Sequence, residues 1–85
     1  MYYVYAISSI NRNYIYVGIT DNIDRRFNQH NKGYEKTTRP YAPFILILTE
    51  SFESRPLARQ KEKYLKSGVG KEFLRKIRAG LSTNR

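Results

Sequence analysis

Cysteine and tryptophan are absent from this sequence of 85 residues, and histidine occurs once. The lack of cysteine excludes disulfide bonds, thiolate zinc sites and cysteine nucleophiles. A single histidine can neither form a histidine-rich metal site nor supply two catalytic imidazoles. No apolar run approaches the ~18 residues that a membrane-spanning helix requires, and the N-terminus lacks the segments of a secretion signal. These absences predict a cytoplasmic protein with no membrane partner.

Acidic residues are scarce compared with basic ones. Asp and Glu total 7 against 16 Lys and Arg, so the formal net charge is +9 at pH 7. Such a surplus is typical of proteins that bind a polyanion, and nucleic acid is the commonest partner. The alternative is a soluble domain with a charged surface. The basic residues are densest in the C-terminal part of the chain, at Arg55, Arg59, Lys61, Lys63, Lys66, Lys71, Arg75, Lys76 and Arg78.

Three runs of β-forming residues predict a small sheet. Residues 2–8 and 14–19 are separated by a short polar break, which predicts a hairpin. Residues 44–48 are apolar throughout and predict a third strand that is covered on both faces. Residues 34–42 are polar, basic and contain proline, so we expect a loop.

Three helices complete the predicted fold. Thr20 and Asp21 are N-cap types that predict the start of the first helix, which should end at Gly33. The second should span residues 54–68 and the third residues 70–80. The order β-β-α-β-α-α predicts an α+β fold with a three-stranded antiparallel sheet flanked by helices. We expect one domain over residues 1–81 and a frayed tail over residues 82–85. The predicted core contains Val4, Ile15, Val17, Phe27, Ile45, Ile47, Leu57, Leu65, Phe73, Leu74 and Ile77.

The first strands carry an unusual density of tyrosine. If residues 5 and 16 pair in the hairpin, Tyr5 and Tyr16 share one face, and their hydroxyls point at one spot. The alternative role for these tyrosines is core packing. Gly18 is costly inside a strand unless a backbone or a ligand approaches it closely.

The first helix places Arg26 and His30 on one flank, because they are four residues apart. Arg25 points about 100° away from Arg26 and lies further from the buried edge. A guanidinium held at that edge suits a phosphate oxygen, since its planar fork donates two hydrogen bonds. The alternatives are an ordinary solvated arginine and a satisfied surface histidine.

Glu62 is the carboxylate with the most unusual placement. It lies four residues after Ala58 and three before Leu65, on the apolar side of its helix. A carboxylate there needs a partner, either a metal ion or a basic side chain. One carboxylate would hold Mg²⁺ with several retained waters, which argues against a two-metal site. Together with the arginine, the histidine and two phenols, it suits phosphodiester hydrolysis.

The ordered set of these residues resembles a known family. Tyr3-Val4-Tyr5 and Tyr16-Val17-Gly18 are similar to the two signature tripeptides of the GIY-YIG nuclease superfamily. Residues 19–31 resemble the helix segment of that family, and Glu62 falls where the family places its metal-binding glutamate. The resemblance covers roughly residues 2–78. It implies a small stand-alone member that resembles the N-terminal GIY-YIG nuclease domain of the bacterial excinuclease.

The resemblance also implies roles for individual residues. Tyr5 would be the general base or would position the water, and Tyr16 would lie near the attacked phosphate. Arg26 would stabilise phosphate charge, and His30 falls where members carry His or Tyr. A phenol with a pKa of about 10 is a poor base at pH 7. We therefore expect Arg26 or a metal ion to lower the pKa of Tyr5, with His30 as the alternative base.

The remaining implied site residues concern the metal and the substrate. Glu62 would bind a single Mg²⁺ or Mn²⁺ ion. We expect substrate contacts from Gly18, which would permit close approach, and from Arg25 and Lys36. The chain departs from the family pattern in two places: Tyr3 replaces the first glycine, and residues 70–81 lack the asparagine that many members carry.

The sequence thus predicts a metal-dependent endonuclease that cuts DNA, with a role in DNA repair or recombination. The first alternative is a nucleic-acid-binding module with a GIY-YIG-like fold that does not cut. The second is a nuclease subunit that needs a protein partner for its DNA specificity, because the chain carries no further DNA-binding domain.

Overall fold

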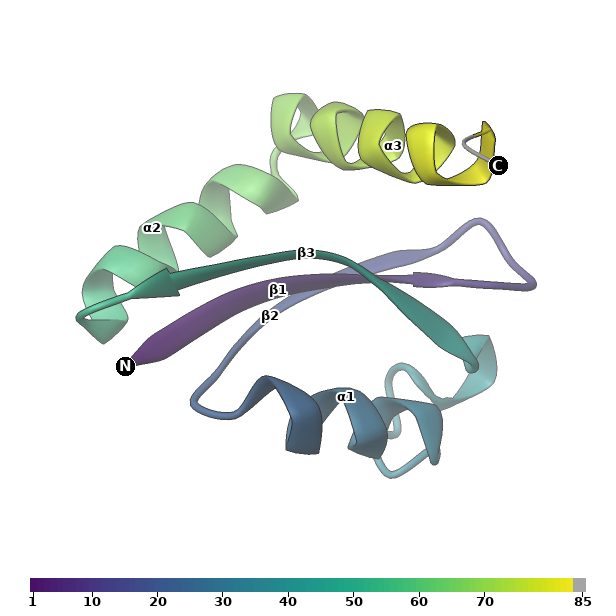
Figure 1. The fold of residues 1–85 in the computed structure, drawn as a ribbon, viewed down its shortest axis with the longest axis horizontal. Helices are drawn as coiled ribbons and strands as arrows, with labels where there is room; N and C mark the ends of the chain where they lie inside the picture. Colours follow the sequence, from purple (N-terminus) through teal and green to yellow (C-terminus); the bar gives the residue numbers. More distant parts are fainter. Residues whose placement is uncertain (84–85) are drawn as a thin grey trace.

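A three-stranded antiparallel sheet lies at the centre of the protein, between α1 on one face and α2 and α3 on the other (Figure 1). The structure is a computed structural model that describes residues 1–83, with side chains to residue 81. The strands are β1 (Tyr2–Ser9), β2 (Ile15–Thr20) and β3 (Phe44–Phe52), in the order β2-β1-β3. The predicted α+β class and the order β-β-α-β-α-α are confirmed.

The alternation of side chains along β1 divides the core into two parts. Val4 and Ala6 pack with α2 and α3, whereas Tyr5 and Ile7 face α1. The register differs from the expected one, since Tyr5 lies opposite Gly18 and not opposite Tyr16. This offset of two residues keeps Tyr5 and Tyr16 on the same face, because a strand has a side-chain period of two.

The first helix, α1 (Ile23–Asn31), is capped one residue later than predicted. The Asn22 side chain accepts a hydrogen bond from the backbone N–H of Arg25 at 3.0 Å. Thr20 cannot take that role, because its hydroxyl accepts the backbone N–H of Asn22 at 3.1 Å and ends β2. The predicted glycine after the helix is confirmed, since Gly33 has a φ of 78°.

The bounds of the other elements differ from the predicted ones, and α2 is shorter than predicted. A short 3₁₀ helix, η1 (Arg39–Tyr41), lies in the predicted loop, and β3 continues four residues past the predicted end. Ser54 caps α2 (Arg55–Lys66) as expected. The third helix, α3 (Gly68–Thr83), starts earlier than predicted and continues through Gly80. Residues 82 and 83 are therefore helical, and residues 84–85 of the predicted tail lie outside the described residues.

Helix faces that point away from the sheet account for two of the three errors in the predicted core, and the third, Ile45, lies on β3. The prediction that this strand is covered on both faces is wrong, because β3 is an edge strand whose Ile45 and Leu46 are exposed. Leu57 is 48% exposed, and Phe73 and Ile45 are also exposed. Leu57 and Phe73 lie on the outer sides of α2 and α3, which pack on the sheet through Ala58 and other small or aliphatic residues. No described element covers those outer sides, and none of the helices within residues 1–83 is long and apolar enough to cross a membrane. The predicted core residues that are buried are Val4, Val17, Ile47, Leu65 and Leu74, and Ile15, Phe27 and Ile77 are partly buried.

Candidate active site

Tyr5, Tyr16 and His30 form a cluster on the α1 face of the sheet. The Tyr5 hydroxyl lies 2.8 Å from Nε2 of His30, and the two side chains are 2% and 0% exposed. The ring of Tyr16 packs beside both, with its centroid 6.2 Å from that of Tyr5 and 5.0 Å from that of His30. The fourth predicted catalytic residue, Arg26, donates a hydrogen bond to Tyr5, so the structure brings all four together. Tyr16 is the more exposed of the two phenols.

Burial determines the charge of His30, and two hydrogen bonds determine which of its ring nitrogens carries the proton. Burial lowers the pKa of His30, so its ring is neutral at pH 7. Its Nδ1 lies 2.8 Å from the hydroxyl of Thr38, which is fully buried. Because Tyr5 is a protonated phenol it donates to Nε2, and Nδ1–H therefore donates to Thr38. Thr38 was not anticipated from the sequence, since the loop that carries it has no periodic pattern.

The expected lowering of the Tyr5 pKa is not found. Burial raises the pKa of Tyr5 to about 12, although a hydrogen bond from Arg26 opposes that effect. Desolvation outweighs the nearby cation, because the phenolate would have to exist away from water. This pKa disfavours Tyr5 as a general base, and full burial of His30 places the imidazole behind the tyrosines and away from solvent.

Arg26 is held in one orientation by two side chains. One guanidinium nitrogen donates to Oε1 of Gln29 at 3.1 Å, and another pairs with the carboxylate of Glu35. The Arg26 guanidinium in turn holds the pKa of Glu35 below its usual range. Nothing in the sequence pointed to Glu35, because it lies nine residues away in an irregular loop. The pair gives an arginine whose geometry is set before any ligand arrives.

Arg25 and Lys36, the other two predicted basic contacts, are more exposed. The Arg25 side chain is 54% exposed against 27% for Arg26, as their 100° separation on the helix predicts. Arg25 forms an ion pair of 2.6 Å with Asp21, which holds the pKa of that carboxyl below its usual range. Lys36 is exposed in the loop after α1.

An open polar groove of about 530 Å³ runs past Arg26 at the end of β2. Its walls carry three arginines, two from α1 and one, Arg55, from the start of α2. Arg55 also lies over the ring of Tyr2, 5.9 Å from its centroid. Three guanidinium groups around one opening suit an anion with several oxygens, such as a phosphodiester. The complete lining is Tyr2, Ile19, Thr20, Asp21, Arg25, Arg26, Gln29 and Arg55.

Gly18 makes room for Tyr5 and not for a ligand. A Cβ atom at this position would lie 2.7 Å from the Tyr5 hydroxyl and 2.9 Å from its Cζ atom. Gly18 is itself buried. The predicted close approach is therefore real, but the group that approaches is the phenol opposite in the strand pair.

Glu62 lies on α2, which packs on the opposite face of the sheet from the tyrosine and histidine cluster (Figure 1). Its side chain is 15% exposed and pairs with Lys66 at 3.1 Å and Arg59 at 3.6 Å. These ion pairs are the alternative to a metal that the sequence left open. Within the described residues, Glu62 makes no polar contact with Tyr5 or Arg26.

The position of Glu62 on α2 nevertheless connects it to the groove. Arg55 and Glu62 are seven residues apart, so they share one side of the helix at about 10.5 Å along its axis. Among residues 1–81, no group of three or more His, Cys, Asp or Glu side chains gathers to hold a metal ion. Any site among these residues therefore has at most two such ligands, and Mg²⁺, which retains several waters, tolerates a site with one carboxylate.

Known proteins resemble this chain in sequence over most of its length. The model of the GIY-YIG catalytic domain matches residues 1–76. The chain is 38% identical over 64 residues to a UPF0213 protein of Vibrio campbellii, and the match covers 74% of this chain but 61% of that relative. It is 39% identical over 67 residues to a UPF0213 protein of Natronomonas pharaonis, with 78% of each chain covered.

A solved structure shows the same fold. The solution NMR structure of a UPF0213 protein from Bacillus halodurans is 34% identical to this chain and superimposes with a TM-score of 0.54. The superposition covers 94% of this chain and 88% of the other. The names of these relatives state no activity, and they do not bear on the predicted similarity to the bacterial excinuclease.

Proposed function

The chain belongs to the GIY-YIG family, and we propose that it is an endonuclease that hydrolyses DNA phosphodiester bonds in the groove beside Arg26. The observation that carries this proposal is the fixed guanidinium of Arg26 in the wall of an arginine-lined groove. A phosphate oxygen entering the groove would meet donors that need no rearrangement. Such preorganised donors stabilise the charge that builds up as the phosphorus is attacked.

The side chains around Arg26 have separate tasks in this proposal. Gln29 and Glu35 hold the guanidinium. The guanidinium also donates a hydrogen bond to Tyr5, whose hydroxyl is bonded to His30. Tyr16, the more exposed phenol, orients the attacking water from beside that pair. This assignment moves the role that the resemblance gave to Tyr5 onto Tyr16, because the Tyr5 hydroxyl is committed to His30.

A divalent metal ion, the general cofactor of this nuclease family, would bind at Glu62. Mg²⁺ or Mn²⁺ held there would act as a Lewis acid on a phosphate oxygen. The lack of any group of three or more possible ligand side chains among the described residues supports one metal ion and not two. Roles in DNA repair or recombination, and a partner that supplies DNA specificity, belong to the same proposal.

The second candidate function is a module that binds nucleic acid without cutting it. The ion pairs of Glu62 with Lys66 and Arg59 favour this function, because both cations would have to give up the carboxylate before a metal could bind. A binding module needs the arginines of the groove but does not need Glu62.

A nicking assay on supercoiled plasmid separates the two functions. The wild-type chain is compared with Glu62→Ala in buffer containing Mg²⁺ or Mn²⁺, and Glu53→Ala is the control that removes an exposed carboxylate. The nuclease proposal requires that Glu62→Ala abolish nicking while DNA binding is kept and that Glu53→Ala cut normally. Nicking by Glu62→Ala at the wild-type rate would refute the metal site, and a wild-type chain that binds but never nicks would be a binding module.

A further inference from the structure

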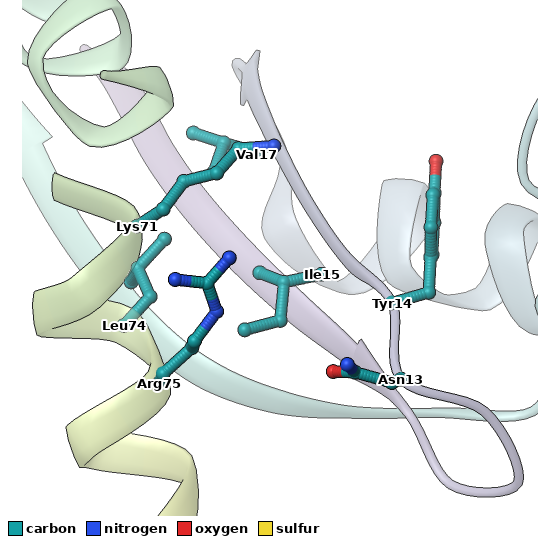
Figure 2. Close-up of a pocket in the computed structure, with 7 residues that line it drawn as sticks. All are labelled: Asn13, Tyr14, Ile15, Val17, Lys71, Leu74 and Arg75. Atoms are coloured by element: carbon teal, nitrogen blue, oxygen red, sulfur yellow. The ribbon is translucent and has the colours of Figure 1, made fainter. Parts of the chain in front are cut away.

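A second basic surface lies on the opposite face of the sheet from the Tyr5 and His30 cluster. Lys71 and Arg75 reach from α3 toward the start of β2, and with Asn13 they line a cavity of about 160 Å³ (Figure 2). The floor of the cavity is aliphatic, formed by Ile15 and Leu74 among others. This cavity belongs neither to the Arg26 groove nor to the tyrosine and histidine cluster.

The surface continues along α3 into an adjoining hollow. That hollow is lined by Arg78 from α3 and by Arg12 and Asn13 from the turn between β1 and β2. Asn13 lines both spaces and joins them. We call the combined surface the α3 groove and define it by Arg12, Asn13, Lys71, Arg75 and Arg78.

The cations of the α3 groove form a regular row. Lys71, Arg75 and Arg78 follow one another at intervals of four and three residues, so they share one side of α3. Arg75 forms an ion pair of 3.3 Å with Glu72. Within the part of the chain that the structure describes, Lys71, Arg78 and Arg12 make no ion pair. A row of cations of which most have no ion-pair partner suits an extended anion whose charges repeat at short intervals.

The two basic surfaces are connected by the edge strand of the sheet. Because the strand order is β2-β1-β3, one side of β2 carries no neighbouring strand among the described residues. Ile15, at the start of this strand, lines the cavity of the α3 groove, and Ile19 and Thr20, at its end, line the Arg26 groove. At about 3.3 Å per residue, the strand spans about 17 Å between them. That length equals about five steps of B-form DNA.

We propose that the α3 groove is a second backbone-binding surface, which holds a DNA duplex about five base pairs away from the phosphodiester in the Arg26 groove. This inference rests on the proposed function, since it takes DNA as the ligand. The cations and the single amide that line the groove recognise phosphate oxygens and carry little means of reading bases. Binding at this surface is therefore expected to be independent of sequence and sensitive to salt.

Charge removal tests the groove directly. Binding of a duplex of 16 base pairs is measured by fluorescence anisotropy over a range of salt concentrations, without metal so that no cleavage occurs. The double variant Lys71→Ala, Arg78→Ala is compared with Lys63→Ala, Lys76→Ala, which removes equal charge from exposed positions outside the groove. We expect the groove variant to lose at least about tenfold in affinity and to lower the salt slope by ~1.8, and the control to change far less. Circular dichroism checks that both variants fold.

A shorter duplex provides a second test of the α3 groove. On a hairpin duplex of four base pairs, which cannot reach both surfaces, the groove variant should lose less affinity than it does on the duplex of 16 base pairs. Equal affinity of the groove variant and the wild type on the long duplex would overturn the inference, as would tighter binding to RNA of the same length. These outcomes are independent of cleavage. If the groove variant loses affinity but the wild type never nicks DNA, only the nuclease proposal is refuted. If the wild type nicks DNA but the groove variant binds as tightly as the wild type, only the proposal of the α3 groove is refuted.

Discussion

The hydroxyl of Tyr5 and Nε2 of His30 lie 2.8 Å apart in the interior of the protein, although they come from β1 and α1. The contact ties the central strand of the sheet to the helix that carries Arg26. It also occupies the hydroxyl that the family resemblance assigns to the attacking water. The proposed mechanism therefore assigns the orientation of the water to the neighbouring phenol, Tyr16, whose side chain is only partly buried.

Substitution of the two tyrosines should distinguish the structural role of Tyr5 from the catalytic role proposed for Tyr16. Tyr5→Phe leaves Nε2 of His30 without its donor and should reduce the free energy of unfolding by about 1–3 kcal/mol. Tyr16→Phe should leave stability nearly unchanged and lower the cleavage rate by ~10²-fold, as removal of a preorganised donor does. Urea denaturation and single-turnover nicking measure the two effects. The assignment is wrong if Tyr5→Phe costs more in rate than Tyr16→Phe at equal folded fraction.

Stability should fall at both ends of the pH range, for two separate reasons. The pKa of Tyr5 is about 12 in the folded protein against 10.0 in the unfolded chain, so its contribution is complete below pH 10 and is lost between pH 10 and pH 12. The pKa of His30 is lowered from 6.5, so its contribution is complete above pH 6.5 and is lost as the pH falls below that value.

Urea denaturation across the pH range measures these losses. The alkaline loss from Tyr5 should be about 2 kcal/mol and should be absent in Tyr5→Phe, which has no proton to release. An equally steep alkaline loss in that variant would show that other groups cause it.

Arg26 and Arg25 provide a matched pair of substitutions, because they are adjacent on α1 and differ in burial. Arg26→Ala should lower the cleavage rate by ~10²–10³-fold, since its guanidinium is fixed beside the groove. Arg25→Ala removes an exposed ion pair with Asp21 and should change the rate far less. Single-turnover cleavage by both variants, with folding checked by circular dichroism, decides the matter. Equal losses would show that the groove acts only through its total charge.

Leu65 and Leu57 test the packing of α2. Leu65 is fully buried against the sheet, so Leu65→Ala should cost about 2–5 kcal/mol of unfolding free energy. Leu57 is 48% exposed on the same helix, and Leu57→Ala should cost less than about 1 kcal/mol. Denaturation midpoints for the two variants provide the comparison. Similar midpoints would mean that α2 packs through a different side.

Local patterns in the sequence determined much of the fold. The alternation of β1 separated Tyr5 and Ile7 from Val4 and Ala6, and the structure places these pairs on opposite faces. The cap at Ser54 and the left-handed conformation after α1 could also be predicted. Each of these features depends on backbone conformation or periodicity over a few consecutive residues, which the sequence displays directly.

Other features were decided only when distant segments packed together. The ion pair of Arg26 with Glu35 joins a helix to an irregular loop, and no spacing rule links them. The raised pKa of Tyr5 depends on how completely the sheet, α1 and the loop exclude water around it. Glu62 was placed correctly on the buried side of α2, but the sheet separates it from the tyrosine and histidine cluster. Burial, desolvation and side-chain partners arise from contacts between elements, and the sequence by itself does not specify those contacts.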